Sequence, residues 1–243
     1  MMEDVFMHGT GNRFLIHCGE QEPGVLLQSL QGADGLLILI EDETADLQMQ
    51  IFNADGTEAE QCGNGLRCAA LHAYRSQIVP STTITIRTLA GLNTCVVHPD
   101  RNEVEVTIGH AKIGPLFCNV QLDLMKDLPE LQFVNMGNPN AVLWTKEEPI
   151  EIRDTFGPVV AKHAGFSEGI NLHVARLDSP NHATVASWER GVGPTLASGS
   201  GGASVFASSN RPSPFIVTSV GGSLKYSKTN DGQIVMSGPA VYG

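Results

Sequence analysis

The chain has 243 residues, of which 42% are hydrophobic and 17% are charged, and its formal net charge is −11. This composition is typical of a globular protein rather than a disordered one, and the scarcity of Lys and Arg argues against nucleic acid or an acidic membrane as a partner. The opening stretch MMEDVFMHGTGNRF carries no basic-then-apolar signal, and the longest apolar run, residues 36–40, is too short to cross a bilayer. We therefore expect a cytoplasmic protein with a small-molecule ligand.

Short β-rich runs bounded by Gly, Asn, Asp or Pro dominate the chain. Thirteen of them are expected to be strands: residues 14–18, 35–40, 47–52, 81–88, 94–98, 103–109, 133–137, 141–145, 171–177, 182–189, 214–220, 222–227 and 233–242. Helical patterns are fewer and cover residues 23–31, 66–74, 155–163 and 202–207. Pro158 is expected in the first turn of its helix. Many short strands and few helices predict a mostly antiparallel, barrel-like α+β architecture.

One stretch occurs twice, as FNADGTEAEQCGNG around Cys62 and as WERGVGPTLASGSG around Ser198. In each copy an aromatic residue, Phe52 or Trp188, precedes by ten positions a small polar residue that opens a glycine-rich turn. A Gly-Asn turn is also repeated, in MHGTGN and in NMGN. Such duplication is typical of a pseudo-symmetric protein of two halves.

The strand pattern pauses near Gly114 and a more acidic segment follows. We therefore expect an N-terminal lobe over residues 1–114, carrying Cys62, and a C-terminal lobe over residues 115–243, carrying Ser198. Lobes of this size are large enough for a core each.

Each glycine-rich turn is followed by an apolar run that predicts a buried helix, so Cys62 and Ser198 are expected near helix N-termini. The unpaired N–H groups and the positive dipole end attract an anion there and lower the pKa of a thiol. Inverting an α-carbon needs a proton removed from one face and donated from the other, and a thiol with an ordinary pKa of about 8.5 suits that task. One such turn is usually only a turn before a helix, but two matched copies favour a cradle for a small carboxylate.

The five cysteines form an odd set without a CxxC pair, which indicates reduced thiols and argues against a metal site. Cys18, Cys95 and Cys118 match no motif and are expected to be small core residues. P-loop, GxGxxG and GxSxG patterns are absent from the glycine-rich turns.

The stretches MHGTGNRF, GADG, FNADGTEAEQCGNGLRCAA, MGNPN, INLHV, WERGVGPTLASGSGGA and SGPA occur in the order and spacing of the diaminopimelate epimerases, which the chain resembles over nearly its whole length. These are cofactor-independent enzymes that interconvert LL- and meso-diaminopimelate. The resemblance implies two lobes, each a barrel-like sheet around a central helix, closing on an amino-acid substrate in the cleft between them. It implies no pyridoxal phosphate, no other cofactor and no metal, and a role in making lysine and peptidoglycan precursors. The oligomeric state stays open, with a homodimer among the states allowed.

The resemblance also implies residue roles. Cys62 and Ser198 fall on the two catalytic positions. Main-chain N–H groups of the two turns correspond to the α-carboxylate cradle, and the other matching positions correspond to substrate-holding side chains. The substrate-binding set is Asn12, Asn53, Gly63, Asn64, Asn138, Asn171, Glu189, Arg190, Gly199 and Ser200. A substrate with two zwitterionic ends needs a guanidinium for a carboxylate, a carboxylate for an ammonium, and amides that serve either.

Two positions depart from the family pattern, because the second catalytic thiol is Ser198 and a histidine after Gly-Asn-Pro is Asn140. A hydroxyl is a far weaker acid than a thiol, and Asn140 does not titrate. Ser198 is therefore open to three explanations: an engineered Cys→Ser change, natural divergence, or different chemistry. Two alternatives to a diaminopimelate epimerase remain, an amino-acid-binding protein of this fold and a racemase or dehydratase for another amino acid.

Overall fold

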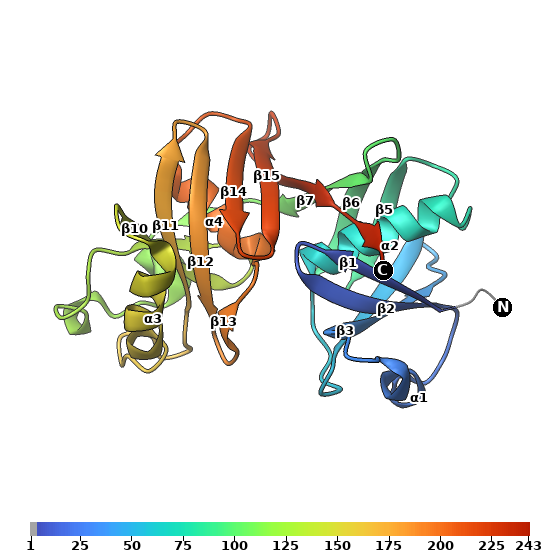
Figure 1. The fold of residues 1–243 in the computed structure, drawn as a ribbon, viewed down its shortest axis with the longest axis horizontal. Coiled ribbons are helices and arrows are strands. Elements are labelled where there is room, and N and C mark those ends of the chain that lie inside the picture. The colour runs from blue at the N-terminus through green and yellow to red at the C-terminus, as the bar shows by residue number, and fades with distance from the viewer. Residues whose placement is uncertain (1–3) are drawn as a thin grey trace. The chain divides into compact units, whose positions relative to one another are not determined.

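The computed structural model describes residues 4–243 (Figure 1). Its strands are β1 (Val5–Gly9), β2 (Asn12–Cys18), β3 (Gly35–Ile40), β4 (Leu47–Asn53), β5 (Thr83–Thr88), β6 (Gly91–His98), β7 (Glu103–Gly109), β8 (Lys112–Ile113), β9 (Gln132–Asn135), β10 (Pro139–Thr145), β11 (Asn171–Ser179), β12 (His182–Glu189), β13 (Gly193–Thr195), β14 (Phe215–Ser219), β15 (Gly222–Lys228), β16 (Ile234–Pro239) and β17 (Val241–Tyr242). Its α-helices are α1 (Pro23–Leu26), α2 (Gly63–Arg75), α3 (Pro149–Val160) and α4 (Gly199–Ser209). Short 3-10 helices cover Leu27–Ser29, Pro115–Cys118 and Leu122–Leu124. Within residues 4–243, no helix combines the length and the apolar character needed to cross a membrane.

Each of the thirteen expected strands overlaps an observed one, and the last run divides into β16 and β17. The prediction missed β1, β8 and β13, which have two to five residues and no clear alternation of polar and apolar side chains. It was also wrong about α3, which begins at Pro149 and holds Pro158 near its end. Pro149 is the N-terminal proline of this helix, because its missing N–H has no partner to lose there.

The chain divides into two compact units, and the division differs from the boundary expected at residue 114. The first unit holds residues up to 107 and residues 237–243, and the second holds residues 108–236. The C-terminal segment returns to the first unit because β17 pairs with β1, matching Met7 with Tyr242. A sequence pattern carries no signal for such a return, since strand pairing across the whole chain depends on tertiary structure.

The two units repeat one topology. In the first, β1 and β2 form a hairpin, β2 runs parallel to β3, β3 antiparallel to β4, and β4 parallel to β5, which pairs with β6. In the second, β9, β10, β11, β12, β14 and β15 follow the same sequence of antiparallel and parallel pairings. Helix α2 packs on the strands of the first unit and α4 on those of the second. The predicted α+β class is confirmed, with mixed sheets that each surround a helix.

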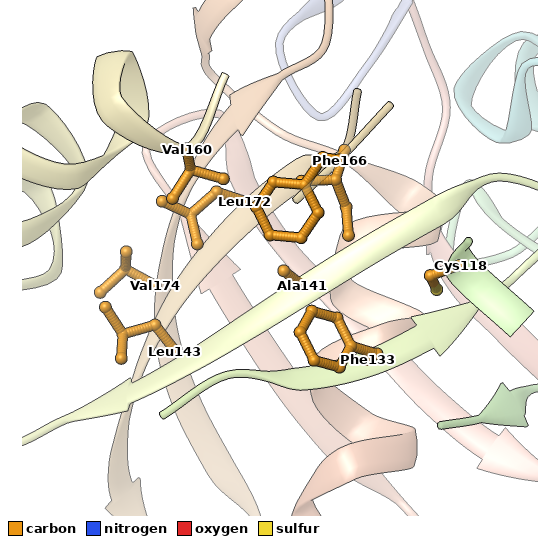
Figure 2. Close-up of a cluster of buried hydrophobic side chains, with 9 residues drawn as sticks. Cys118, Phe133, Ala141, Leu143, Val160, Phe166, Leu172 and Val174 are labelled. Atoms are coloured by element: carbon orange, nitrogen blue, oxygen red, sulfur yellow. The ribbon is translucent and has the colours of Figure 1, made fainter. Parts of the chain in front are cut away.

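Alternation along the strands decides which side chains face each helix. In β11, Leu172 and Val174 belong to an apolar cluster that α3 covers through Val160. Figure 2 shows Leu172 near Val160 and Phe166, and Val174 near Leu143. The intervening residue His173 therefore points to the other face of the sheet, toward α4. Burial on both faces makes β11 a central strand, and it sets polar side chains on the α4 side beneath the first turn of that helix.

Candidate active site

Cys62 is the N-cap residue of α2. Its backbone is extended, with φ −145° and ψ 107°, and the N–H of Gly65 donates to its Sγ over 3.3 Å. The side chain is only partly buried. Its sulfur therefore lies at the positive end of the helix dipole and remains accessible to a ligand.

Ser198 is the N-cap residue of α4 in the same geometry. Its backbone has φ −139° and ψ 119°, and the N–H of Gly201 donates to its Oγ over 3.1 Å. The expectation that both duplicated turns open a helix at the polar residue is confirmed. Ser204, one turn further on, donates its Oγ to the carbonyl oxygen of Ser200 and is fully buried.

Asn12 and Asn64 contact each other beside the first of these turns. Asn64 Nδ2 donates to Asn12 Oδ1 over 2.6 Å, and Thr10 Oγ1 donates to Asn64 Oδ1 over 3.1 Å. The buried guanidinium of Arg67 donates to Thr10 Oγ1 over 2.9 Å and to the carbonyl oxygen of Pro239 over 3.2 Å. Two expected ligand residues are thus held by a buried polar network that the sequence did not reveal.

Asn53 ends β4 and starts the turn that leads toward Cys62. Its Nδ2 donates to Thr57 Oγ1 over 2.9 Å, and its main-chain N–H donates to the carbonyl oxygen of Thr57 over 2.8 Å. The residue is exposed, so its side chain is available to a ligand while its backbone is fixed by the turn.

Asn138 stands at the corresponding place beside α4. Its Nδ2 donates to Ser200 Oγ over 3.3 Å, just as Asn12 contacts Asn64 in the first unit. The repeated Gly-Asn turn therefore sets an asparagine against the second residue of the helix in both units.

Asn171 and Arg190 are linked at the edge of the same polar region. The main-chain N–H of Arg190 donates to Asn171 Oδ1 over 2.9 Å, and the guanidinium of Arg190 donates to the carbonyl oxygen of Glu168 over 2.7 Å. Gly169 has φ +71°, and a Cβ there would come within 2.7 Å of the Arg190 side chain. The glycine permits this close approach and so helps to fix the path of the arginine.

Glu189 contacts Ser198. The Ser198 side chain lies near enough to the Glu189 carboxylate to lower its pKa, and Thr195 Oγ1 donates to Glu189 Oε1 over 3.1 Å. Burial raises the pKa of the Glu189 carboxyl above its usual value, since desolvation outweighs the opposing effects of Ser198 and Thr195. The sequence associated Glu189 with a substrate ammonium and did not predict this pairing, which arises because the turn after β12 folds back through β13 before α4 begins.

His173 and Asn140 are fully buried, and no role was predicted for His173. His173 Nε2 contacts Asn140 Oδ1 at 3.0 Å and its Nδ1 contacts Ser187 Oγ at 2.9 Å. Burial lowers the pKa of His173 to about 3, so the ring is neutral near pH 7. A polar residue within the otherwise apolar run LHVA was the signal that could have found it.

The remaining cysteines lie elsewhere. Cys68, Cys95 and Cys118 are buried, and burial raises the pKa of Cys68 and Cys95 to about 12. Cys18 is only partly buried, so the expectation of a core position was wrong for it, and burial is still the main reason that its pKa rises to about 11.

Two units of one topology, each with a small polar residue capping a central helix, define a fold shared with racemases and related enzymes. The structure is similar to a PhzF-family protein from Bacillus anthracis, with a TM-score of 0.74 and 16% identity over 98% of this chain and 96% of that one. It is also similar to a hydroxyproline epimerase from Agrobacterium vitis, with a TM-score of 0.67 and 12% identity over 99% and 90% of the two chains.

The sequence identifies the family within this fold. The family model for diaminopimelate epimerase matches residues 28–114 and 132–243. The chain is 35% identical to a diaminopimelate epimerase of Desulforudis audaxviator, over 98% of this chain and 96% of the relative. It is 33% identical to one of Alkaliphilus metalliredigens, over 96% and 93%. The chain belongs to the diaminopimelate epimerase family, and the resemblance found from its motifs is confirmed. It is an enzyme of the isomerase class.

Proposed function

We propose that this chain interconverts LL- and meso-diaminopimelate without a cofactor, with Cys62 and Ser198 as its two acid/base positions. This activity would serve the synthesis of lysine and of peptidoglycan precursors in the cytoplasm. The observation that carries the proposal is the repeated N-cap: the same extended backbone and the same N–H contact hold Cys62 Sγ and Ser198 Oγ at the start of a helix.

Each helix start also supplies the groups that an ionised α-carboxylate needs. Main-chain N–H groups of the first helical turn have no carbonyl partner within the helix, and they lie at the positive end of its dipole. The proposal assigns Gly63 and Asn64, and Gly199 and Ser200, to this role. An oxygen that gains negative charge as the α-proton leaves is stabilised by such preorganised donors.

In this proposal, side chains bind the distal end of the substrate. Asn12, Asn53, Asn138 and Asn171 supply amides, and Arg190 supplies a guanidinium for a carboxylate. Asn12 is held through Oδ1 alone, and Asn53 through Nδ2 and its backbone. Asn138 and Asn171 use both ends of the amide, but each Nδ2 makes one hydrogen bond and keeps its second hydrogen for a ligand.

Proton transfer differs between the two positions. Cys62 is a thiol that can itself hold or release a proton near neutral pH. The hydroxyl of Ser198 cannot ionise in that range, but the Glu189 carboxylate lies near it and is the nearby group that can take a proton. A proton taken from the α-carbon by Ser198 Oγ would release the hydroxyl proton to the Glu189 carboxylate, and the reverse transfer would return it. Glu189 is then the group that changes charge, and burial has already raised its pKa toward neutrality.

The test is α-proton exchange in D2O, measured by mass spectrometry from pure LL- and pure meso-diaminopimelate. We expect both isomers to be labelled, with the direction that begins at Cys62 faster. Ser198→Cys should then raise the slower direction, because it restores a titratable group at that position. Conversion by neither form would contradict the proposed function.

Ser198 also favours a second candidate, an amino-acid-binding protein of this fold that has lost turnover. The N–H groups of α4 do not depend on a thiol and would bind a carboxylate unchanged. Titration calorimetry beside the exchange assay separates the two, since binding of diaminopimelate without any labelling supports the binding protein. A racemase or dehydratase for another amino acid is separated by substrate profiling with proline, glutamate and diaminopimelate.

A further inference from the structure

Asn140 is a buried amide whose four hydrogen-bonding positions are all used. Its Nδ2 donates to the carbonyl oxygen of Asn138 over 2.8 Å and to Asn138 Oδ1 over 3.0 Å. Its Oδ1 accepts from Asn171 Nδ2 over 3.2 Å and lies 3.0 Å from His173 Nε2. An amide has two donor hydrogens and two acceptor lone pairs, so this side chain is saturated.

The orientation of every group in this network follows from one backbone atom. The carbonyl oxygen of Asn138 can only accept, so the Asn140 atom that faces it must be Nδ2. The second hydrogen of that nitrogen goes to Asn138, which must therefore present Oδ1 to Asn140 and turn its Nδ2 the other way. That Nδ2 gives one hydrogen to Ser200 Oγ, and among residues 4–243 the second hydrogen has no acceptor.

His173 completes the orientation from the other side. Because Asn140 Oδ1 only accepts, His173 Nε2 must carry the hydrogen, and Ser187 then donates its hydroxyl hydrogen to Nδ1. The ring cannot move away, since Gly201 lies against it: a Cβ at Gly201 would be 2.3 Å from Cε1 of the ring. His173 is thus fixed between β12 and the first turn of α4.

We propose that Asn140 and His173 are positioning residues that fix the Asn138 amide with its N–H outward, so that Asn138 recognises a carboxylate of the substrate and not an ammonium. This inference rests on the proposed function and deepens it, because amides as such can bind either group. It also gives Asn140 a role at the position where the family pattern has a titratable histidine.

Three variants test the proposal with meso-diaminopimelate. Asn140→Asp removes both donors to Asn138 and keeps the size of the side chain. His173→Leu removes the donor to Asn140, whereas His173→Gln keeps one and is the matched control. We expect KM to rise roughly tenfold to hundredfold in Asn140→Asp and His173→Leu, as for a lost hydrogen bond to a charged group, with kcat changed by less than about threefold. His173→Gln should stay within about threefold of the wild type in both constants.

A merely structural role predicts a different pattern. Partial unfolding lowers the active fraction, so kcat would fall in all three variants while KM stayed constant. That result, or an unchanged KM in Asn140→Asp, overturns the positioning role.

A measurement on the wild type covers the case in which the variants do not fold. Nitrogen-15 NMR of His173 should show hydrogen on Nε2 and no titration between about pH 5 and 8. Hydrogen on Nδ1, or titration in that range, overturns the inference. If the wild type fails to label diaminopimelate, the proposed function fails, and the affinities of the same variants measured by calorimetry still decide the role of Asn140 and His173.

Discussion

Cys62 and Ser198 occupy the same backbone position in the two units, but the side chains packed beneath the two helices differ in polarity. In the first unit the strand residue beneath the helical turn is Leu37, whose side chain would lie 3.1 Å from a Cβ added at Gly65. The helix carries the fully buried side chain of Arg67. In the second unit the strand residue is His173, beneath Gly201, and the helix carries Ala203 where α2 has Arg67. The buried polar side chain thus belongs to the helix in the first unit and to a strand in the second.

The paired strand residues at this level also differ in polarity between the two units. Phe14 pairs with Gly35 in the first unit, and at the matching register Asn140 pairs with Asn171 in the second. A shared topology thus fixes the path of the backbone but not the polarity of the side chains beneath the helix, because these side chains have only to fill the space there. The unit with the thiol has Leu37 beneath the first turn of its helix, and the unit with serine has a neutral polar network there and a buried carboxylate nearby.

The largest expected effect is that of removing the Cys62 thiol, for which the second unit has a serine. Cys62→Ala should lower α-proton exchange by roughly 10²–10⁴-fold, the usual contribution of a general acid or base. Cys18→Ala is the control, since Cys18 is also only partly buried but belongs to no proposed site. Retained exchange in Cys62→Ala, measured by deuterium incorporation, would remove this thiol from the mechanism.

The next largest effect is expected from replacing Arg67, the buried arginine of the first unit. Arg67→Met leaves the oxygens of Pro239 and Thr10 without a donor, at about 1–3 kcal/mol each. Hydrogen exchange should show roughly 10–10³-fold faster opening of α2 amides, with α4 amides as the internal control. Equal loss of protection in both helices would show that Arg67 supports the whole chain and not one unit.

Glu189→Gln tests the carboxylate that only the second unit has. The amide keeps the shape but cannot take the proton passed on by Ser198, so the slower direction of epimerisation should fall by about tenfold to hundredfold. Because burial raises the pKa of Glu189, the wild-type rate should fall as the pH drops through a value above that of an ordinary carboxyl. Glu189→Gln should lose this acidic limb, whereas an unchanged pH profile would separate Glu189 from proton transfer.

The smallest effect concerns the pH dependence of stability. The folded-state pKa of His173 is lowered from 6.5 to about 3, so below pH 6.5 the unfolded state binds a proton that the folded state does not. The free energy of unfolding should therefore fall by about 1.4 kcal/mol per pH unit on this account, from roughly pH 6 to pH 4. Burial also lowers the pKa of His72 in the first unit, which adds in the same direction.

Urea unfolding at several pH values measures this slope, and the two tryptophans, Trp144 and Trp188, both report on the second unit. His173→Gln should flatten the slope of that unit by about one proton. A slope equal to that of the wild type would mean that His173 is accessible to water and charged when folded.

The sequence by itself determined the local features of this protein. Short β-rich runs bounded by Gly, Asn, Asp or Pro predicted thirteen strands, and the doubled motif predicted that Cys62 and Ser198 each begin a helix. Both signals depend on neighbours within a few residues. It missed the shortest strands and the start of α3, where two to five residues or a single proline carry the signal.

Tertiary structure decided what those features face. The contact of Glu189 with Ser198, the pairing of Asn140 with His173, and the return of Tyr242 to the first unit join residues that are separated along the chain. No local pattern encodes such pairs, since a buried polar group is stable with any partner that satisfies its hydrogen bonds, and only the packed fold selects which one is present.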